Sequence, residues 1–222
     1  SDGNKCSIHN SFSINDYWLY DWSDSCYQFA TKEELQTAVN LWVSDNESAL
    51  STYGEINTWN TSLITDMSNL FMSLNGLYIN FNDDISNWDV SNVTTMYSMF
   101  YKARSFNQPL NDWDVSSVTN MYGMFAEARS FNQDLSSWNV SNVTNMHGLF
   151  SNTSFNQDIS SWDVSSVTVM PGMFQFTPFN QDISSWDVSS AINMGSMFNN
   201  ANALSDGNKC SIHNSFSIND YW

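Results

Sequence analysis

The stretch FNQDLSSWNVSNVTNMHGLF, residues 131–150, recurs with small changes along most of the chain. The tryptophan of each copy marks the period, and the six copies place it at Trp59, Trp88, Trp113, Trp138, Trp162 and Trp186. The last four steps between these residues are 25, 25, 24 and 24 residues long, and the first is 29. Self-similarity at such a period indicates a stack of supersecondary units rather than a conventional globule.

Each copy combines two hydrophobic periodicities. Trp138 and Val140 flank a polar residue, and an alternation with a period of two is typical of a short strand. The next apolar residues are spaced i, i+3, i+6 and i+7, which predicts one face of a short helix: Val143, Met146, Leu149 and Phe150. The FNQD motif then turns a corner. We therefore expect an α/β repeat solenoid, in which each coil of 24–25 residues adds one strand, one helix and one corner.

The chain divides into three expected parts. Residues 1–54 hold an aromatic-rich segment and a capping helix from Thr31 to about Val43, whose start is marked by the capping box Thr31–Glu34. Residues 44–54 are polar and are expected to form a connection. Residues 55–204 carry the six coils. Residues 205–222 repeat residues 1–18, SDGNKCSIHNSFSINDYW, without a single change.

The repeated ends predict a tandem array. An offset of 204 residues between identical segments is explained if the chain is one unit followed by the start of the next. A copied terminal cap, or an artefact of cloning, would explain the same identity. The cysteines fit the array: Cys6 and Cys26 are predicted to form a disulfide worth about 3 kcal/mol, with two buried thiols as the alternative. Cys210, the copy of Cys6, would then pair within the next unit.

Charge excludes several partners. The chain holds 23 Asp and Glu against 6 Lys and Arg, for a net charge of -17. Such a surface disfavours nucleic acid and anionic membranes, and it suits cations, basic partners or solubility alone. There is no apolar run long enough to span a bilayer, so no membrane span is expected. The high Ser, Asn and Thr content resembles that of secreted surface proteins.

The copies of the form FNQDISSWDVSSVT resemble the BspA-like leucine-rich-repeat surface proteins, and most of all their mycoplasma lipoprotein-type and algal branch. The resemblance covers residues 55–204, and FATKEELQTAVNLW is similar to the helix that precedes such repeats in algal members. It implies a leucine-rich-repeat-like right-handed stack, an extracellular or cell-surface location and no enzymatic activity. Two features depart from the family: Trp occupies the usual Leu or Ile strand position, and the two ends are identical.

The polar residue between Trp and Val is expected to point outward and to form a column along the stack. Its carboxylates are Asp89, Asp114, Asp163 and Asp187, and Asn60 and Asn139 take the remaining places. Like charges at the spacing of neighbouring strands repel each other. Solvent, hydroxyl donors such as Ser116 and Ser165, or a bound calcium ion would relieve that repulsion. No other cofactor is expected. A second column, Asp84, Asp134, Asp158 and Asp182, lies at the corner, where it is expected to cap backbone groups of the next coil.

The asparagine that follows Phe at the corner never varies among five copies: Asn82, Asn107, Asn132, Asn156 and Asn180. Because buried corner backbone needs partners, we expect these amides to form a hydrogen-bonded ladder. Five further asparagines lie in Asn-X-Ser/Thr sequons and are candidates for glycosylation: Asn46, Asn60, Asn92, Asn142 and Asn152. No catalytic set recurs, and His147 has no histidine at its position in the other coils.

The sequence therefore predicts an extracellular structural protein, one unit of a tandem array that joins copies of itself into a fibre or surface layer. The alternative is a cell-surface adhesin that recognises a glycan or a protein through one face of the stack. An enzyme has no support in the sequence.

Overall fold

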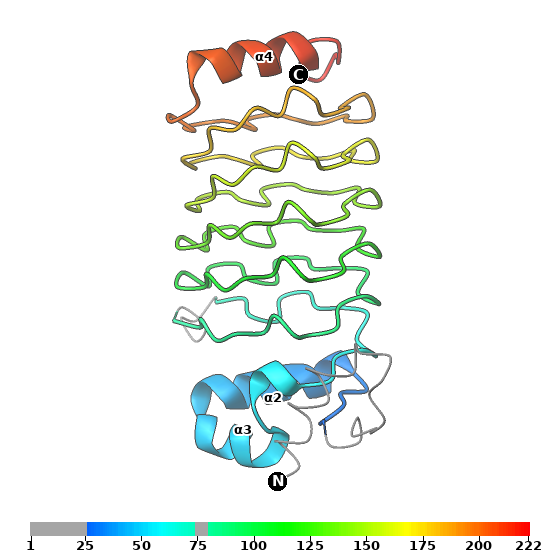
Figure 1. Cartoon of the computed structure of the whole chain (residues 1–222), viewed down its shortest axis with the longest axis vertical. Helices are drawn as coiled ribbons and strands as arrows, with labels where there is room; N and C mark the ends of the chain where they lie inside the picture. Colours follow the sequence, from blue (N-terminus) through cyan, green and yellow to red (C-terminus); the bar gives the residue numbers. More distant parts are fainter. Residues whose placement is uncertain (1–25, 74–79) are drawn as a thin grey trace, which may run out of the picture.

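The computed structural model describes residues 26–73 and 80–222 (Figure 1). Its helical elements are α2 (Lys32–Ser44), α3 (Asn46–Tyr53), the short 3-10 helix η2 (Ile56–Thr58) and α4 (Asp206–Phe216). Helices α2 and α3 lie at one end of the molecule, α4 lies at the other, and the repeats lie between them, one coil upon the next (Figure 1).

The predicted α/β fold class is wrong. Within the described part of residues 59–204, the coils contain turns and isolated bridges but neither an α-helix nor a regular strand. The molecule is therefore not an α/β repeat solenoid or a leucine-rich-repeat-like stack of strands and helices. Successive coils are connected instead by single parallel bridges, which run Asp66–Thr95, Thr95–Asn120, Asn120–Asn145, Asn145–Val169 and Val169–Asn193.

The predicted helix is absent because its N–H groups bond to the next coil. Four alternate residues donate to carbonyls one coil further on at 2.8–3.0 Å, in the pairs Met146–Val169, Gly148–Pro171, Phe150–Met173 and Asn152–Gln175. Gly148 and Asn152 have φ angles of 60° and 59°. This left-handed conformation cannot continue a right-handed helix. The apolar residues still reach the core together, because consecutive tight turns bring every third or fourth side chain to one side, as a helix would. One such turn is closed by the Leu149 N–H, which donates to the Met146 carbonyl.

The predicted strand is absent because turns close on both sides of it. Trp138 and Val140 are buried and Asn139 is exposed, as the alternation predicts. However, the N–H of Trp138 donates to the Leu135 carbonyl at 3.1 Å, and the N–H of Val143 donates to the Val140 carbonyl at 2.9 Å. Only a few extended residues remain between these turns, which is too short a run for a ladder of strand pairs.

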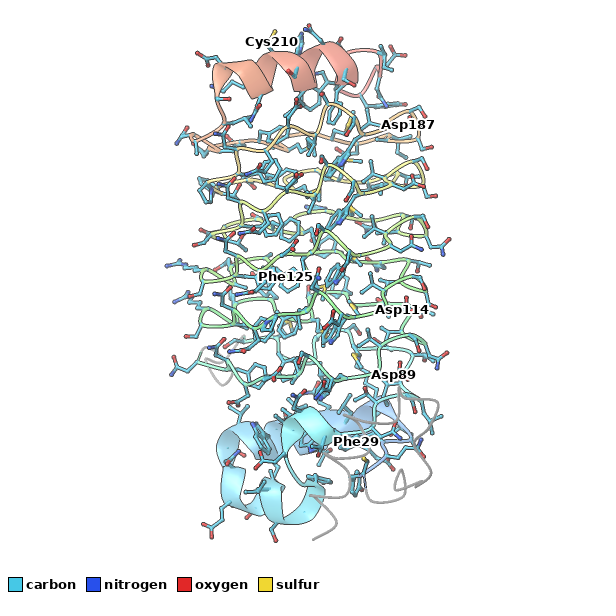
Figure 2. All side chains as sticks on the ribbon, in the orientation of Figure 1. Phe29, Asp89, Asp114, Phe125, Asp187 and Cys210 are labelled. Atoms are coloured by element: carbon cyan, nitrogen blue, oxygen red, sulfur yellow. The ribbon has the colours of Figure 1, made fainter. Side chains whose placement is uncertain are left out.

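Aromatic side chains stack along the interior of the molecule. The ring centroid of Phe125 lies 5.5 Å from that of Phe100 and 5.9 Å from that of Phe150, with the rings within 4° of parallel. Figure 2 shows Phe125 in the middle of the stack. From the second coil on, the indole of each repeat also donates to a backbone carbonyl about one repeat earlier, as Trp138 Nε1 does to the Leu110 carbonyl at 2.8 Å. Stacking of this kind buries apolar surface and also fixes the orientation of the rings relative to one another.

The first end of the stack is covered by α2. Thr31 caps the helix by accepting from the Glu34 N–H at 3.2 Å, and Glu34 in turn accepts from the Ala30 N–H at 2.9 Å. Trp42 of this helix meets Trp59 of the first coil edge to face at 5.8 Å. The capping helix thus begins where the sequence predicts. The polar connection predicted for residues 44–54 is wrong, because Asp45 caps a second helix, α3, by accepting from the Ser48 N–H.

The last end of the stack is covered by the segment that repeats residues 1–18. Ser205 caps α4 by accepting from the Asn208 N–H at 3.2 Å. Ile212 and Phe216 project from α4 into the stack and are 1% and 0% exposed. The repeated segment therefore completes the hydrophobic core of the last coil.

Truncation of a stacked phenylalanine tests this core. We expect Phe125→Ala to lower the free energy of unfolding by about 3–5 kcal/mol, since it removes a buried ring between two others. Phe176→Ala is the matched control, because Phe176 is 53% exposed, and should change it by less than about 0.5 kcal/mol. Urea unfolding followed by tryptophan fluorescence measures both. Equal losses in the two variants would contradict the stacked core.

Candidate functional site

The corner asparagines form a continuous chain of hydrogen bonds along the stack. Each side-chain oxygen accepts from the backbone N–H of the asparagine one coil further on, at 2.7–2.9 Å, in the pairs Asn82–Asn107, Asn107–Asn132, Asn132–Asn156 and Asn156–Asn180. In the four later coils a glutamine follows the asparagine and donates to the carbonyl of the asparagine one coil earlier, as Gln133 does to Asn107 at 2.9 Å. These amides connect each coil to the next, and their side-chain oxygens are used in the ladder.

The repeated C-terminal segment continues this ladder. The N–H of Ser205 donates to the Asn180 side-chain oxygen at 2.8 Å, which is the bond that a further coil would make. Asn208 Nδ2 donates to the Asn180 carbonyl at 2.9 Å, in the role that glutamine plays in the coils. The segment thus bonds to the last coil as another coil would.

The predicted carboxylate column is exposed, and each member is bonded within its own coil. The side-chain oxygen of Asp89, Asp114, Asp163 and Asp187 accepts from the N–H of the serine two residues later at 3.0–3.1 Å. Figure 2 shows Asp89, Asp114 and Asp187 along one edge of the stack. Asn139 makes the same bond to Ser141. Among the described residues no group of three or more His, Cys, Asp or Glu could hold a metal ion. Calcium binding here stays a prediction.

Serine donors change the acidity of this column. The hydroxyl and then the N–H of Ser116 lower the pKa of Asp114 below its ordinary 3.8. Ser165 and Ser189 lower the pKa of Asp163 and of Asp187 in the same way. Repulsion between Asp163 and Asp187 opposes this and is the weakest of the influences on Asp163. Hydroxyl donors, one of the three ways of relieving the repulsion, are therefore present in the structure.

The second carboxylate column also forms turns within each coil. Asp84, Asp134, Asp158 and Asp182 each accept from a serine N–H two residues later at 2.9 Å. They do not reach backbone groups of the next coil through these bonds.

The sequons lie on the surface or at its edge. Asn46, Asn92 and Asn142 are exposed, and Asn60 and Asn152 are half-buried. Asn92 and Asn142 lie at the same repeat position, and each uses Nδ2 to donate to a serine carbonyl of the preceding coil, at 2.9 and 2.8 Å. A glycan on this nitrogen would have to leave that bond intact, and glycosylation stays a prediction.

The cysteines lie at opposite ends of the described chain. Cys26 is disulfide-bonded. Cys6 lies outside the described residues, so its pairing with Cys26 stays a prediction. Cys210 is a free, exposed thiol on α4, on the side away from the stack (Figure 2).

A groove that the sequence analysis did not foresee runs across several coils. It has a volume of about 520 Å³ and is lined by Tyr97, Tyr122, His147, Glu127 and Gln175, among others. Tyr97 and Tyr122 stack at 4.8 Å. Gly123, Gly148 and Gly172 also line it, and their lack of side chains leaves the space open. The signal available in the sequence was this column of glycines at one repeat position.

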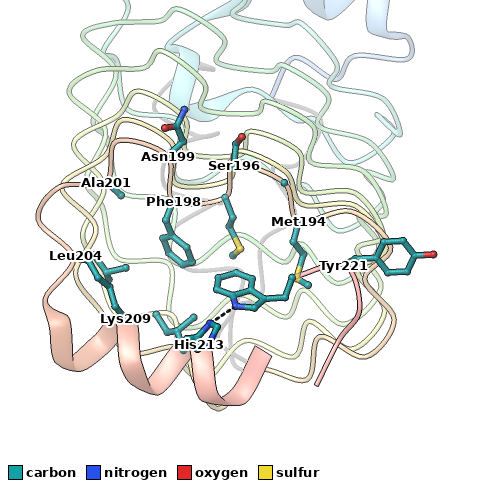
Figure 3. A pocket seen from close by; sticks show the side chains of 13 residues that line it. Met194, Ser196, Phe198, Asn199, Ala201, Leu204, Lys209, His213 and Tyr221 are labelled. Carbon is teal, nitrogen blue, oxygen red and sulfur yellow. Dashed lines mark hydrogen bonds between the residues drawn. The ribbon is translucent and has the colours of Figure 1, made fainter. Parts of the chain in front are cut away.

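A second hollow lies beside α4, at the end of the stack (Figure 3). It measures about 680 Å³, and its lining is mainly apolar: Met194, Met197, Phe198, Ile212 and Trp222 contribute to it. Trp222 lines the hollow and donates through Nε1 to His213 Nδ1 at 3.0 Å. The repeated segment therefore covers the last coil but leaves part of the end open.

The serine-bonded carboxylates predict a specific response to acid. A pKa lowered by folding contributes stability above the unfolded value, and that stability is lost as the pH falls through the folded value. We expect the variant Asp114→Asn, Asp163→Asn, Asp187→Asn to fold as the wild type does at pH 7, because Asn139 shows that an amide makes the same turn, but to be less stable there because it lacks the charged acceptors. Its loss of stability below about pH 4 should be smaller.

The opposite substitution, Asn139→Asp, is the matched control and should enlarge the loss of stability in acid. Urea unfolding at pH 7 and pH 3 measures both variants. An acid response that is the same in all three proteins would show that these carboxylates are merely solvated.

The chain matches a known protein family. Its model, described as "Mycoplasma protein of unknown function, DUF285", matches residues 37–154 and 137–220. No curated protein and no solved structure matches the chain. In the part of the chain that the structure describes, no helix has the length and apolar character needed to cross a membrane. The chain belongs to the DUF285 family of Mycoplasma proteins of unknown function.

Proposed function

We propose that this protein is an extracellular structural module, one unit of a tandem array that builds a fibre or a surface layer. The observation that carries the proposal is the return of residues 1–18 as residues 205–222. The second copy bonds to the last coil through the asparagine ladder and closes the core with Ile212 and Phe216. A segment that begins one unit is thus well suited to cover the end of the unit before it.

Two further features support an exported, structural role. Cys26 is disulfide-bonded, and structural disulfides are typical of oxidising compartments outside the cytosol. Each coil is held to the next by backbone hydrogen bonds, by hydrogen bonds of side-chain amides and by stacked aromatic rings. Neighbouring coils therefore resist separation at several points. The partners in this proposal are copies of the same unit.

The mass of the mature polypeptide tests the array. We expect the protein isolated from its source to contain several units of about 204 residues, each beginning with the SDGNKC segment. Intact-mass measurement together with peptide mapping across the joints checks this. A mature chain that holds a single unit would rule out the tandem array.

A second function, adhesion through a glycan or a protein ligand, is favoured by the groove at Tyr97 and Tyr122. The groove combines aromatic rings with the carboxylate of Glu127 and the amide of Gln175. Aromatic rings beside a few polar groups are typical of ligand sites.

Binding assays on this groove test adhesion. If the groove binds a ligand, Tyr122→Ala should weaken binding on a glycan array or in a pull-down by about tenfold, the factor for a loss of about 1.4 kcal/mol. Leu63→Ala is a control at an exposed residue outside the groove. The triple Asp→Asn variant tests the carboxylate face in the same assay. No binding by the wild type, or equal binding by wild type and Tyr122→Ala, would reject the groove.

A further inference from the structure

The exposed end of the last coil is a binding surface for the repeated segment. We call this surface the socket, and residues 205–222 occupy it. The socket offers the carbonyls of Asn180, Ser184 and Val188 to three side chains of the occupant. Asn208 bonds to the first at 2.9 Å, Ser215 to the second at 2.6 Å and Asn219 to the third at 2.6 Å. These bonds span residues 208–219, so contacts along most of the segment hold it in place.

The recognition is carried by side chains that all lie within the repeated sequence. Besides the three polar residues, Ile212 and Phe216 fill the apolar end of the stack. The same side chains occur in the same order near the start of the chain, as Asn4, Ile8, Ser11, Phe12 and Asn15. A socket that accepts residues 205–222 thus finds the same chemical groups in residues 1–18.

We propose that residues 1–18 of a second copy of this chain bind the socket when residues 205–222 leave it, so that two copies join end to end. The joint deepens the proposed array, since it is the contact by which one unit meets the next. It also holds for separate chains, whether or not the natural polypeptide contains several units.

The free face of α4 fits a second copy in this place. Cys210 is exposed on the side away from the stack (Figure 2). Its counterpart Cys6 would face away from the socket in the same way, and so toward the rest of the second copy, where Cys26 forms its disulfide. Cys6 of the docked segment would thus face the rest of its own copy and not the socket.

The hollow beside α4 also matches the residues that follow the N-terminal copy of the segment. Trp222 lines this apolar space, which measures about 680 Å³. In a second copy, the residues that follow Trp18 are Leu19, Tyr20, Asp21 and Trp22. Three of these four side chains are large and apolar or aromatic, so they match the chemistry of the Met194, Met197 and Phe198 lining.

In the unaltered chain, residues 205–222 compete for the socket more effectively than residues 1–18 of a second molecule. A tethered ligand faces its site at an effective concentration in the millimolar range, far above that of a second protein molecule. We therefore expect the wild-type chain to be closed and monomeric in dilute solution. The exchange becomes visible when the attached segment is weakened and the N-terminal copy is left intact.

Two matched full-length variants test the exchange. Ile212→Asp with Phe216→Asp weakens the attached segment and leaves residues 1–18 unchanged. The fourfold variant adds Ile8→Asp and Phe12→Asp, which weakens both copies. Sedimentation velocity over a range of concentrations should show that the double variant at least doubles its mass, to about a dimer or longer chains. The fourfold variant should stay monomeric. A double variant that stays monomeric, or a fourfold variant that associates equally, would overturn the proposal.

A synthetic peptide SDGNKCSIHNSFSINDYW separates exchange from misfolding. Added in excess to the double variant, it should occupy the sockets and return the assemblies to monomers, while a peptide with Asp in place of its Ile and Phe should not. If neither peptide dissolves the assemblies, they form by another route and the proposal fails. These outcomes concern separate chains, so they are independent of the mass of the natural polypeptide, which tests the array.

Discussion

The coils of this protein depend on hydrogen bonds that leave the coil. Residues such as Met146, Gly148 and Phe150 donate to the next coil, not to their own chain four residues back. The corner asparagines and the buried indoles add bonds that also cross between coils. Since buried backbone groups must be paired, a single coil would carry a row of orphaned donors and acceptors. Neighbours are therefore a condition of folding, which explains why the chain repeats one pattern six times.

The same constraint makes the two ends of the stack special, because each has only one neighbour. At the first end, Gln28 forms a bridge to Asn60, and Trp42 donates to Asp83 at 2.8 Å. At the last end, Asn208 and Ser205 replace the next coil on the asparagine ladder. One cover therefore uses mainly a helix pair and its aromatic residues, while the other copies the polar contacts of a coil. The second kind is the one suited to a surface where units continue.

Burial could be predicted from the sequence, whereas secondary structure could not. Val143, Met146, Leu149 and Phe150 are all 0% exposed, as their spacing indicates. The spacing does not distinguish a helix from consecutive turns, because both bring every third or fourth side chain to the core. The local signal against a helix was Gly148, whose positive φ ends any right-handed helical path. Tyr97 and Tyr122 occupy the same repeat position one coil apart and stack, but the groove beside them is lined by residues of several coils, so no single repeat reveals it.

The repeated 18-residue segment contains more than its role as a cover requires. Covering the last coil uses Ile212, Phe216 and the polar contacts of Asn208 and Asn219. Ile218 and Tyr221 take no part in that core and are 81% and 59% exposed. Covering large apolar side chains with a second surface removes them from water and lowers the free energy. The coils also expose large apolar or aromatic side chains, at Leu63, Tyr97, Phe176 and Ile192, but these are spread over four coils, whereas Ile218, Tyr221 and Trp222 lie within five residues of one another. The apolar surface that remains at the end of the stack is therefore where another body would gain most by binding.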